Sequence, residues 1–209
     1  MIRRTLVFDI GGVVVHWNPL QLLQQVLPQH AHDEVSAKAV AAAVFQGLTP
    51  HGDWSEFDRG RIEPGPLAER IAARTGFALH SIRALIAAIP THIQPMPASV
   101  ALLERVRSAG HRLTLLSNMP RPYADHLESA HECFGWFEAA VFSGRIGLMK
   151  PEPAMFDHAR EFLTIDLDQA LFIDDHAGNI AAARVLGWQA LLFENAAQCE
   201  ADLLRSGWL

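Results

Sequence analysis

Polar side chains that could do chemistry stand at four places in this chain, each at the end of an apolar run or in a loop just before a helical pattern. They are a single carboxylate, a hydroxyl beside an amide, one lysine and a pair of carboxylates, at Asp9, Ser117-Asn118, Lys150 and Asp174-Asp175. A carboxylate can act as a nucleophile, and a hydroxyl with neighbouring backbone N–H groups can hold a phosphate. Taken singly, each segment also has an ordinary explanation as a turn, a helix cap or a solvated loop.

The adjacent carboxylates of Asp174 and Asp175 are the segment that most suggests a metal ion. Two neighbouring carboxylates repel each other, and a hard divalent cation, which prefers oxygen ligands, would relieve that repulsion. Lys150 is one of only two lysines in the chain, and it would set a compact positive charge against an anion.

Other common sites find little support. Gly11 and Gly12 follow Asp9, but the GxGxxG pattern of a dinucleotide-binding loop is absent and the glycines lead into three valines rather than a helix. Cys133 and Cys199 match neither a metal spacing nor a disulfide framework. The eleven histidines form no zinc motif.

The apolar runs predict the elements that position these residues. Five short β-rich runs lie at residues 5–10, 112–118, 139–143, 170–175 and 189–194. Most of them are continuous rather than alternating, which is typical of parallel strands covered on both faces. Helical patterns at 99–109, 153–163 and 180–186 separate the later runs, with Phe162 or Leu163 completing the apolar face of the second. This alternation predicts an α/β fold with a doubly wound parallel sheet.

Residues 17–92 differ from the rest, because they show helical faces and no convincing strand. We therefore expect an α/β core of residues 1–16 and 93–209 with an inserted small all-helical domain at 17–92. Pro90, Pro95 and Pro97 are taken as the return linker. An insertion after the first strand would stand over the carboxyl ends of the strands, where open α/β sheets bind ligands.

Composition excludes several classes of protein. The 209 residues suffice for one core with a small accessory domain, and a net charge of −6 argues against a broad nucleic-acid-binding surface. No segment approaches a membrane span, and Asp9 ends the first apolar run too early for a signal peptide. We expect a cytoplasmic protein with no nucleic-acid or membrane partner; the sequence does not predict its oligomeric state.

The order of the four segments resembles that of the haloacid dehalogenase-like (HAD) hydrolase superfamily over essentially the whole chain, including a helical cap after the first motif. The amino-acid sequence of these motifs is similar to that of a branch of small-cap phosphatases, which includes glucose-1-phosphate phosphatases and the phosphatase domain of epoxide hydrolases. Three segments carry this likeness: Phe8–Val15, Phe57–Ile62 and Phe172–Ile180.

This resemblance implies a Rossmann-like core and a Mg²⁺-dependent phosphatase acting on a small phosphorylated metabolite, with a sugar phosphate such as glucose 1-phosphate favoured. Asp9 would attack phosphorus to form an aspartyl-phosphate, which water then hydrolyses. The roles implied for the other residues are metal binding by Asp9, Gly11, Asp174 and Asp175, and phosphate or substrate binding by Ser117, Asn118, Lys150 and Gly12.

One position departs from the usual superfamily pattern. Most of its phosphatases have a second Asp two residues after the nucleophile as general acid, and here that position is Gly11. General acid catalysis typically contributes about 10²–10⁴-fold. Our hypothesis is that His16 or Asp58 replaces this acid, although His16 is equally well explained as an exposed hinge residue.

Two alternatives stay open. A 2-haloacid dehalogenase would share Asp9, Ser117-Asn118 and Lys150, but it needs no metal, and the Asp174-Asp175 pair argues against it. A non-catalytic phosphate-binding protein is the other, and the retention of Asp9 and Lys150 argues against that. The substrate would be chosen by the cap, where Phe45, His51, Trp54, Arg59 and Arg61 are candidates to face the pocket.

Overall fold

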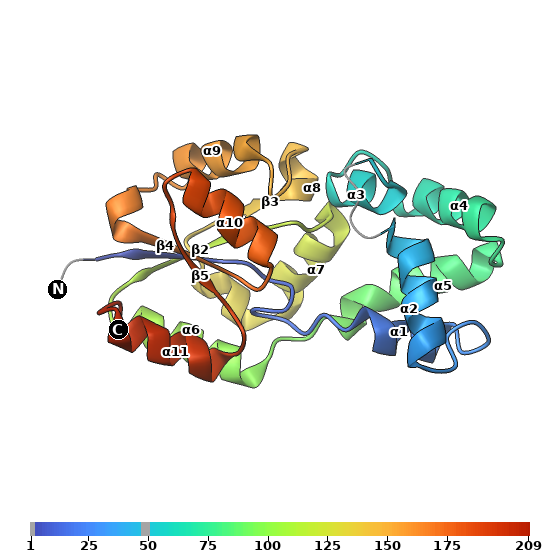
Figure 1. Ribbon diagram of the computed structural model, residues 1–209, viewed down its shortest axis with the longest axis horizontal. Coiled ribbons are helices and arrows are strands. Elements are labelled where there is room, and N and C mark those ends of the chain that lie inside the picture. The colour runs from blue at the N-terminus through green and yellow to red at the C-terminus, as the bar shows by residue number, and fades with distance from the viewer. Residues whose placement is uncertain (1–2, 47–50) are drawn as a thin grey trace.

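The computed structural model describes residues 3–46 and 51–209. Within these residues it contains a five-stranded, all-parallel sheet of strand order β3-β2-β1-β4-β5, which confirms the predicted doubly wound α/β fold (Figure 1). The strands are β1 Thr5–Phe8, β2 Arg112–Ser117, β3 Ala139–Phe142, β4 Ala170–Asp174 and β5 Gln189–Leu192. Each begins where its apolar run begins, and the polar site residues fall at or just beyond its end.

Helices cover both faces of the sheet, which explains why the strands are apolar throughout. Successive side chains of β1 enter different clusters, since Leu6 and Phe8 pack on one face and Val7 packs on the other. Helices α6 Pro97–Ser108, α7 Arg121–Ala130 and α11 Ala196–Arg205 cover the first face, and α9 Pro153–Phe162 and α10 Ala177–Val185 cover the second (Figure 1).

The sequence marks the starts of these helices better than their ends. Helices α6 and α9 begin with a proline in the first turn, where its missing N–H costs nothing. At the end of α9, Leu163 is fully buried whereas Phe162 is 59% exposed, so Leu163 completes the apolar face. Shorter elements complete the core: α8 Ser143–Ile146 and the 3₁₀ turns η2 Glu132–Trp136 and η3 Leu167–Gln169.

Five helices and no strand occupy the described part of residues 17–92: α1 Pro19–Val26, α2 Glu34–Phe45, α3 Asp53–Asp58, α4 Pro64–Thr75 and α5 Leu79–His92. The interpretation of Pro90 as part of a linker is wrong, because Pro90 lies inside the last turns of α5. The domain boundaries at residues 16 and 92 stay a prediction. We call residues 17–92 the helical insertion.

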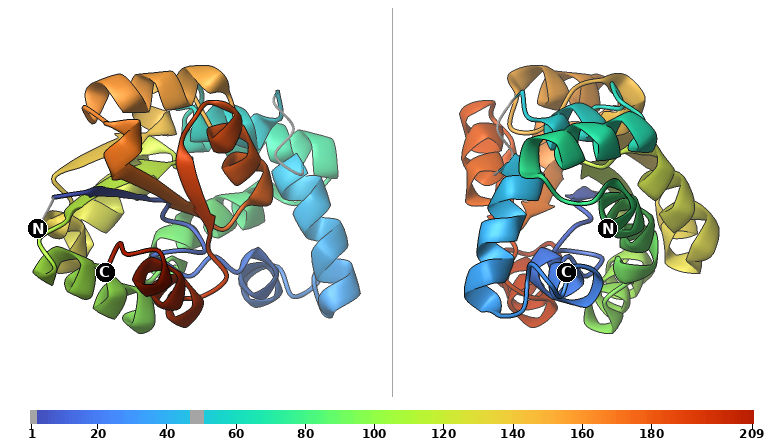
Figure 2. Two further views of the ribbon diagram at one scale, coloured as in Figure 1. Left: turned by 60° about the vertical axis from the view of Figure 1, so that its left-hand side comes forward. Right: turned by 90° about the vertical axis from the view of Figure 1, so that its right-hand side faces the viewer.

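The insertion stands beside the sheet at the edge where the site residues gather (Figures 1 and 2). Strand order reverses at β1, because β2 and β3 follow on one side of it and β4 and β5 on the other. Ligands of open α/β sheets bind at such a switch point, outside the carboxyl ends of the strands. None of the described helices is both long and apolar enough to cross a membrane.

Candidate active site

Asp9, Lys150 and Asp174 form a buried charged cluster at the carboxyl ends of β1 and β4. The Lys150 ammonium lies 2.6 Å from Asp174 Oδ2 and 2.9 Å from Asp9 Oδ1. It also lies 5.3 Å from the centre of the Phe172 ring on β4. Lys150 is 2% exposed and Asp174 is fully buried, so this ammonium is held by its partners and not by water.

The position of Lys150 is fixed by the side chain of Asn118. The Asn118 amide donates to the Lys150 carbonyl and its oxygen accepts from the Lys150 backbone N–H, both at 2.8 Å. This reciprocal pair joins the end of β2 to a loop 32 residues away in sequence. The structure thus gives the Asn118 side chain a positioning role that the sequence interpretation, which used only its backbone amide, did not include.

Asp174 is the most constrained carboxylate of the cluster. Its Oδ1 accepts from the backbone N–H of His176 at 2.7 Å, and the Asn179 amide donates to both carboxylate oxygens at 3.0 and 3.1 Å. Because Asp174 also receives the Lys150 ammonium, its orientation is set before any ligand arrives. Asn179, in the first turn of α10, therefore orients the cluster.

The electrostatics of the cluster follow from its burial. Burial raises the pKa of Asp9 to about 6, with a further upward push from Asp174 and a downward pull from Lys150 and from a hydrogen bond with Ser117. The pKa of Asp175 is also raised, chiefly by burial and then by Asp174. Burial alone would lower the pKa of Lys150, but the two carboxylates beside it raise that pKa overall.

Gly12 lets Asp175 approach the loop that follows Asp9. The glycine has a φ of +75°, and a Cβ placed on it would lie 2.2 Å from Asp175 Oδ2. The loop closes tightly, with the Gly12 N–H donating to the Val15 carbonyl at 2.9 Å. Any other residue at position 12 would therefore strain the backbone and displace Asp175.

The acidic groups fit a divalent cation. Asp9, Asp174 and Asp175 each offer a carboxylate oxygen, and these oxygens lie within 4.8 Å of one another. Asp9 Oδ1 is buried beside the ammonium yet accepts no hydrogen bond of regular geometry. Three carboxylates and one ammonium leave two negative charges uncompensated, and hard oxygen donors of this kind are what Mg²⁺ prefers.

The helical insertion is fastened to the loop that carries Lys150. The Arg59 guanidinium forms a two-pronged ion pair with Glu152, one contact being 2.9 Å, and it is 6% exposed. The Ser143 hydroxyl donates to the Asp58 carbonyl at 2.5 Å and accepts from the Met119 N–H at 2.8 Å.

Backbone also meets backbone at this junction. A Cβ on Gly60 would lie 2.3 Å from the Gly144 carbonyl oxygen, so these two segments touch without side chains between them. The turn at the end of α3 is consequently held against the core by hydrogen bonds, an ion pair and direct backbone contact.

His16 and Asp58 do not join the Asp9 cluster by any hydrogen bond or ion pair within the described residues. His16 is exposed, and its backbone N–H donates to the Gln94 carbonyl. Asp58 is 6% exposed, and burial raises its pKa well above the usual range, with Arg59 opposing. Asp58 is thus a buried acid of raised pKa at the junction of insertion and core.

The aromatic residues of the insertion pack in a row that ends on the core. Edge-to-face contacts join neighbouring rings at centroid distances of 4.6–5.8 Å, in the order Trp17, Phe45, Trp54, Phe57 and Tyr123. Phe45 and Trp54, which we expected to be candidates for lining a pocket, are at most 9% exposed. Trp17 is the open end of the row, at 38% exposed.

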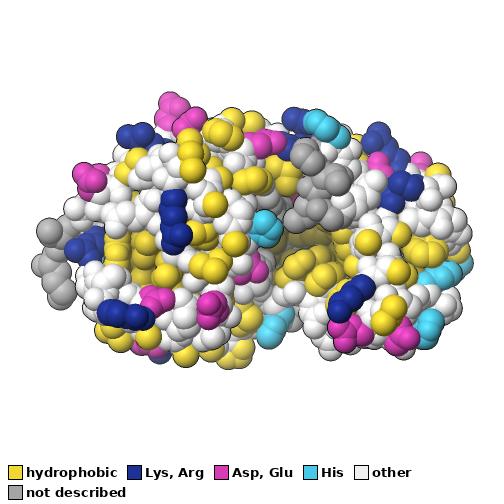
Figure 3. Space-filling model, in the orientation of Figure 1, with side chains coloured by type: hydrophobic (Ala, Val, Ile, Leu, Met, Phe, Trp, Pro, Cys, Tyr) yellow, Lys and Arg dark blue, Asp and Glu magenta, His cyan; other side chains and the backbone are white. Residues whose placement is uncertain are grey.

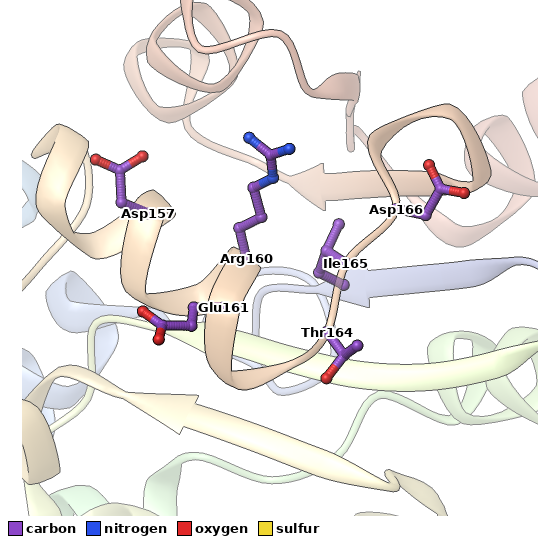
Figure 4. A pocket seen from close by; sticks show the side chains of 6 residues that line it. All are labelled: Asp157, Arg160, Glu161, Thr164, Ile165 and Asp166. Carbon is purple, nitrogen blue, oxygen red and sulfur yellow. The ribbon is translucent and has the colours of Figure 1, made fainter.

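Surface depressions elsewhere are separate from this cluster. One is lined by Asp157, Arg160, Glu161, Thr164, Ile165 and Asp166 (Figure 4). It lies at the end of α9 and in the segment leading into β4, hence at the amino ends of the strands and opposite the site. The surface view shows instead a hollow between core and insertion with hydrophobic side chains along it (Figure 3).

Glu152, Ser143 and Gly144 are the junction residues that sequence reasoning missed. Their partners lie 24–93 positions away, so no local pattern reveals them. The only hint was the pair of prolines flanking Glu152, which marks a stiff backbone at that position.

Comparisons with known proteins identify the family of this chain. A model of the haloacid dehalogenase-like hydrolases matches residues 3–187. The chain is 24% identical over 194 residues to the sesquiterpene phosphatase astK of Aspergillus oryzae, covering 92% of this chain and 91% of that protein.

Two solved structures show the same fold. The HAD family enzyme bt-2542 of Bacteroides thetaiotaomicron, in complex with magnesium and inorganic phosphate, superimposes with a TM-score of 0.69 at 20% identity, covering 91% of this chain and 93% of that chain. The L-2-haloacid dehalogenase RSc1362 gives a TM-score of 0.72 at 17% identity, covering 93% and 87%. With the family model matching most of its length, the chain belongs to the haloacid dehalogenase-like hydrolases.

Proposed function

We propose that this hydrolase is a Mg²⁺-dependent phosphatase that removes phosphate from a small metabolite through an aspartyl-phosphate on Asp9. The observation that carries the proposal is the buried cluster in which one ammonium bridges Asp9 and Asp174 beside a third carboxylate. Such a cluster combines a nucleophile, a fixed positive charge and a set of metal ligands. The similarity to a named phosphatase supports the same reaction.

In the first step an Asp9 carboxylate oxygen forms a bond to phosphorus as the bond from phosphorus to the leaving oxygen breaks. In the second step water attacks phosphorus, inorganic phosphate departs and the Asp9 carboxylate is restored. Dividing one difficult displacement into two is the usual benefit of a covalent intermediate. Lys150 neutralises charge on the transferring group, and Ser117 with the loop at Asn118 holds its oxygens.

Magnesium held by Asp9, Asp174, Asp175 and the carbonyl of Gly11 would supply electrostatic stabilisation of the phosphoryl oxygens. Residues of the chain itself hold the metal-binding carboxylates in position. Asn179 and the His176 N–H orient Asp174, and Gly12 leaves room for Asp175.

Protonation of the leaving group is assigned to His16 or Asp58, because Gly11 replaces the usual acid. Burial raises the pKa of Asp58, which favours its protonated form, whereas His16 stands on the segment that enters the insertion. A sugar 1-phosphate such as glucose 1-phosphate is our favoured substrate, since its anomeric oxygen leaves more readily than an ordinary alcohol and asks less of this acid.

The two cysteines bear on the cellular compartment of the protein. Cys133 and Cys199 are buried and free, as in proteins of a reducing compartment, which supports a cytoplasmic location. Two alternative functions remain. One is a haloacid dehalogenase, since the fold is similar to that of RSc1362, and the other is a phosphate-binding protein without turnover.

One assay separates the three. Hydrolysis of 4-nitrophenyl phosphate is measured with Mg²⁺ and with excess chelator, for the wild type and for Asp9→Asn. A phosphatase shows turnover that needs Mg²⁺ and falls by several orders of magnitude in the variant. Chloride release from 2-chloropropionate without metal would establish the dehalogenase instead, and binding of phosphate with neither activity would establish the binding protein.

A further inference from the structure

Every lysine and arginine of the helical insertion is already paired with a carboxylate. The six pairs have nitrogen–oxygen distances of at most 3.7 Å: Lys38–Glu34, Arg59–Glu152, Arg61–Glu56, Arg70–Asp53, Arg74–Asp53 and Arg83–Glu69. Residues 47–50, which lie outside the described part, contain no charged residue. Each Lys and Arg of the insertion therefore has an acidic partner, with Asp53 serving both Arg70 and Arg74.

The two arginines nearest the Lys150 loop are the most firmly committed. Arg59 is buried and holds Glu152 with two nitrogens, and Arg61 donates to the Gly147 carbonyl as well as pairing with Glu56. Arg59 Nε is buried without a hydrogen-bond partner, so it can donate to a neutral oxygen. Its positive charge, however, is balanced by Glu152.

The core cluster has no spare positive charge either. Lys150 is shared between Asp9 and Asp174, and Asp175 stands close by. The phosphoryl group that reacts would require both this ammonium and the metal. A second anionic group on the same substrate would therefore find no unshared ammonium in this cluster.

Trp17 supplies an apolar surface next to the nucleophile loop. A Cβ on Gly11 would lie 4.0 Å from Trp17 Cβ, so the Trp17 side chain begins beside the position two residues after Asp9. The ring is propped edge-on by Phe45 at 5.8 Å. It is one of five large hydrophobic side chains exposed among the described residues, and the other four, Val35, Phe162, Val185 and Leu204, lie on helices.

We infer that the leaving group of the substrate is uncharged and lies with an apolar face on Trp17. This deepens the proposed function, on which it rests, by excluding substrates that carry a carboxylate or a second phosphate. Glucose 1-phosphate satisfies the charge condition; glucose 1,6-bisphosphate and phosphoglycolate do not.

The charge condition is tested with matched pairs of substrates in Mg²⁺ at pH 8, where histidine side chains in general carry little charge. The pairs are phenyl phosphate with 4-carboxyphenyl phosphate, and glucose 1-phosphate with glucose 1,6-bisphosphate. We expect the neutral member of each pair to have a kcat/KM about tenfold higher or more, because the extra anion has no unshared ammonium or guanidinium of the cluster or the insertion to pair with. Equal values, or preference for the anionic members, would overturn the inference.

The proposed contact between the leaving group and Trp17 is tested by comparing Trp17→Ala with Phe162→Ala, which removes an exposed aromatic ring from α9. Trp17→Ala should lower kcat/KM for phenyl phosphate about tenfold more than for acetyl phosphate, whose leaving group is too small to cover the indole. Phe162→Ala should leave that ratio at the wild-type value. Equal ratios in both variants would refute the role of Trp17.

Arg121 provides a second control, because it lies four residues after Ser117 and its pair with Asp125 is exposed. Arg121→Ala should not change the preference for neutral substrates; a loss confined to the anionic members would show that Arg121 receives them and would overturn the inference. The proposed function fails in a different way: none of the four substrates would then release phosphate in Mg²⁺.

Discussion

Arg59 and Glu152 form an ion pair, and we expect replacement of either partner to destabilise the protein to a different extent. Arg59 is 6% exposed at its side chain and Glu152 is 38% exposed. Replacing Glu152 by Gln keeps the shape but leaves a buried guanidinium without its counter-charge. Replacing Arg59 by Met keeps the apolar stem and leaves a carboxylate that water can reach. The first change should therefore cost more than the second.

The expected loss of stability follows from how far the two side chains of the pair are exposed to solvent. Breaking a fully buried pair costs about 3–5 kcal/mol, and an exposed pair about 0.2–1 kcal/mol. With one side half-open, the value for hydrogen bonds to charged groups, about 1.5–3 kcal/mol, is the appropriate scale for Glu152→Gln. At roughly 2–4 °C per kcal/mol for a chain of this size, the expected fall in Tm is about 3–12 °C.

Thermal unfolding of the two single variants and the double variant Arg59→Met/Glu152→Gln measures this. We expect the double variant to be more stable than Glu152→Gln alone, because it removes the stranded charge. Glu200→Gln breaks the exposed Arg105–Glu200 pair as a matched control and should lower Tm by less than about 3 °C. Equal shifts in Glu152→Gln and Glu200→Gln would refute the reasoning.

The pH dependence supplies a second readout. Hydrogen bonding to Arg59 lowers the pKa of Glu152, so its carboxylate stabilises the fold at pH values above the ordinary glutamate pKa and loses that effect as pH falls through the lowered folded-state pKa. The difference between wild type and Glu152→Gln should accordingly be full at pH 7 and shrink below about pH 4. A difference that grew on acidification would contradict this sign.

Two further changes test the site itself. If His16 or Asp58 is the general acid, His16→Ala or Asp58→Asn should slow phenyl phosphate hydrolysis about 10²-fold or more while affecting 4-nitrophenyl phosphate, which needs little protonation, much less; equal slowing of both substrates would remove that residue from the role. Gly12→Ala should displace Asp175 and strain a backbone of positive φ, costing about 1–2 kcal/mol and raising the Mg²⁺ concentration needed for half-maximal turnover; an unchanged Mg²⁺ titration would mean that Asp175 does not contribute to metal binding.

The sequence predicts the fold well because each strand can be recognised from a local run of apolar residues. A parallel strand buried on both faces must be apolar throughout, as in Leu171–Ile173, and its end is visible where Asp174 interrupts the run. Helix ends are less visible. Pro90 lies inside α5, where the Ile86 carbonyl that its missing N–H leaves free accepts from the Tyr123 hydroxyl at 3.0 Å, so the usual breaker signal misplaces the boundary.

The candidate site residues are predictable as types, but their mutual arrangement is not. Asn118 reads as a turn or a cap residue, and only the folded chain brings its amide to the Lys150 backbone. Glu152 similarly reads as a loop residue until Arg59, 93 positions earlier, meets it. Complementary pairs of this kind have no spacing rule, because the fold rather than the local chain sets their distance.

Burial explains why the members of the Asp9 cluster act as a unit. Besides burial, Asp174 raises the pKa of both Asp9 and Asp175, and Lys150 lowers the pKa of Asp9 while owing its own raised pKa to Asp9 and Asp174. In a low-dielectric site, removing any one charge changes the protonation of the others. A single ammonium cannot balance three carboxylates, so a proton or a divalent cation must complete the cluster. In our proposals, the Mg²⁺ cofactor and the uncharged leaving group both rest on this shortage of positive charge.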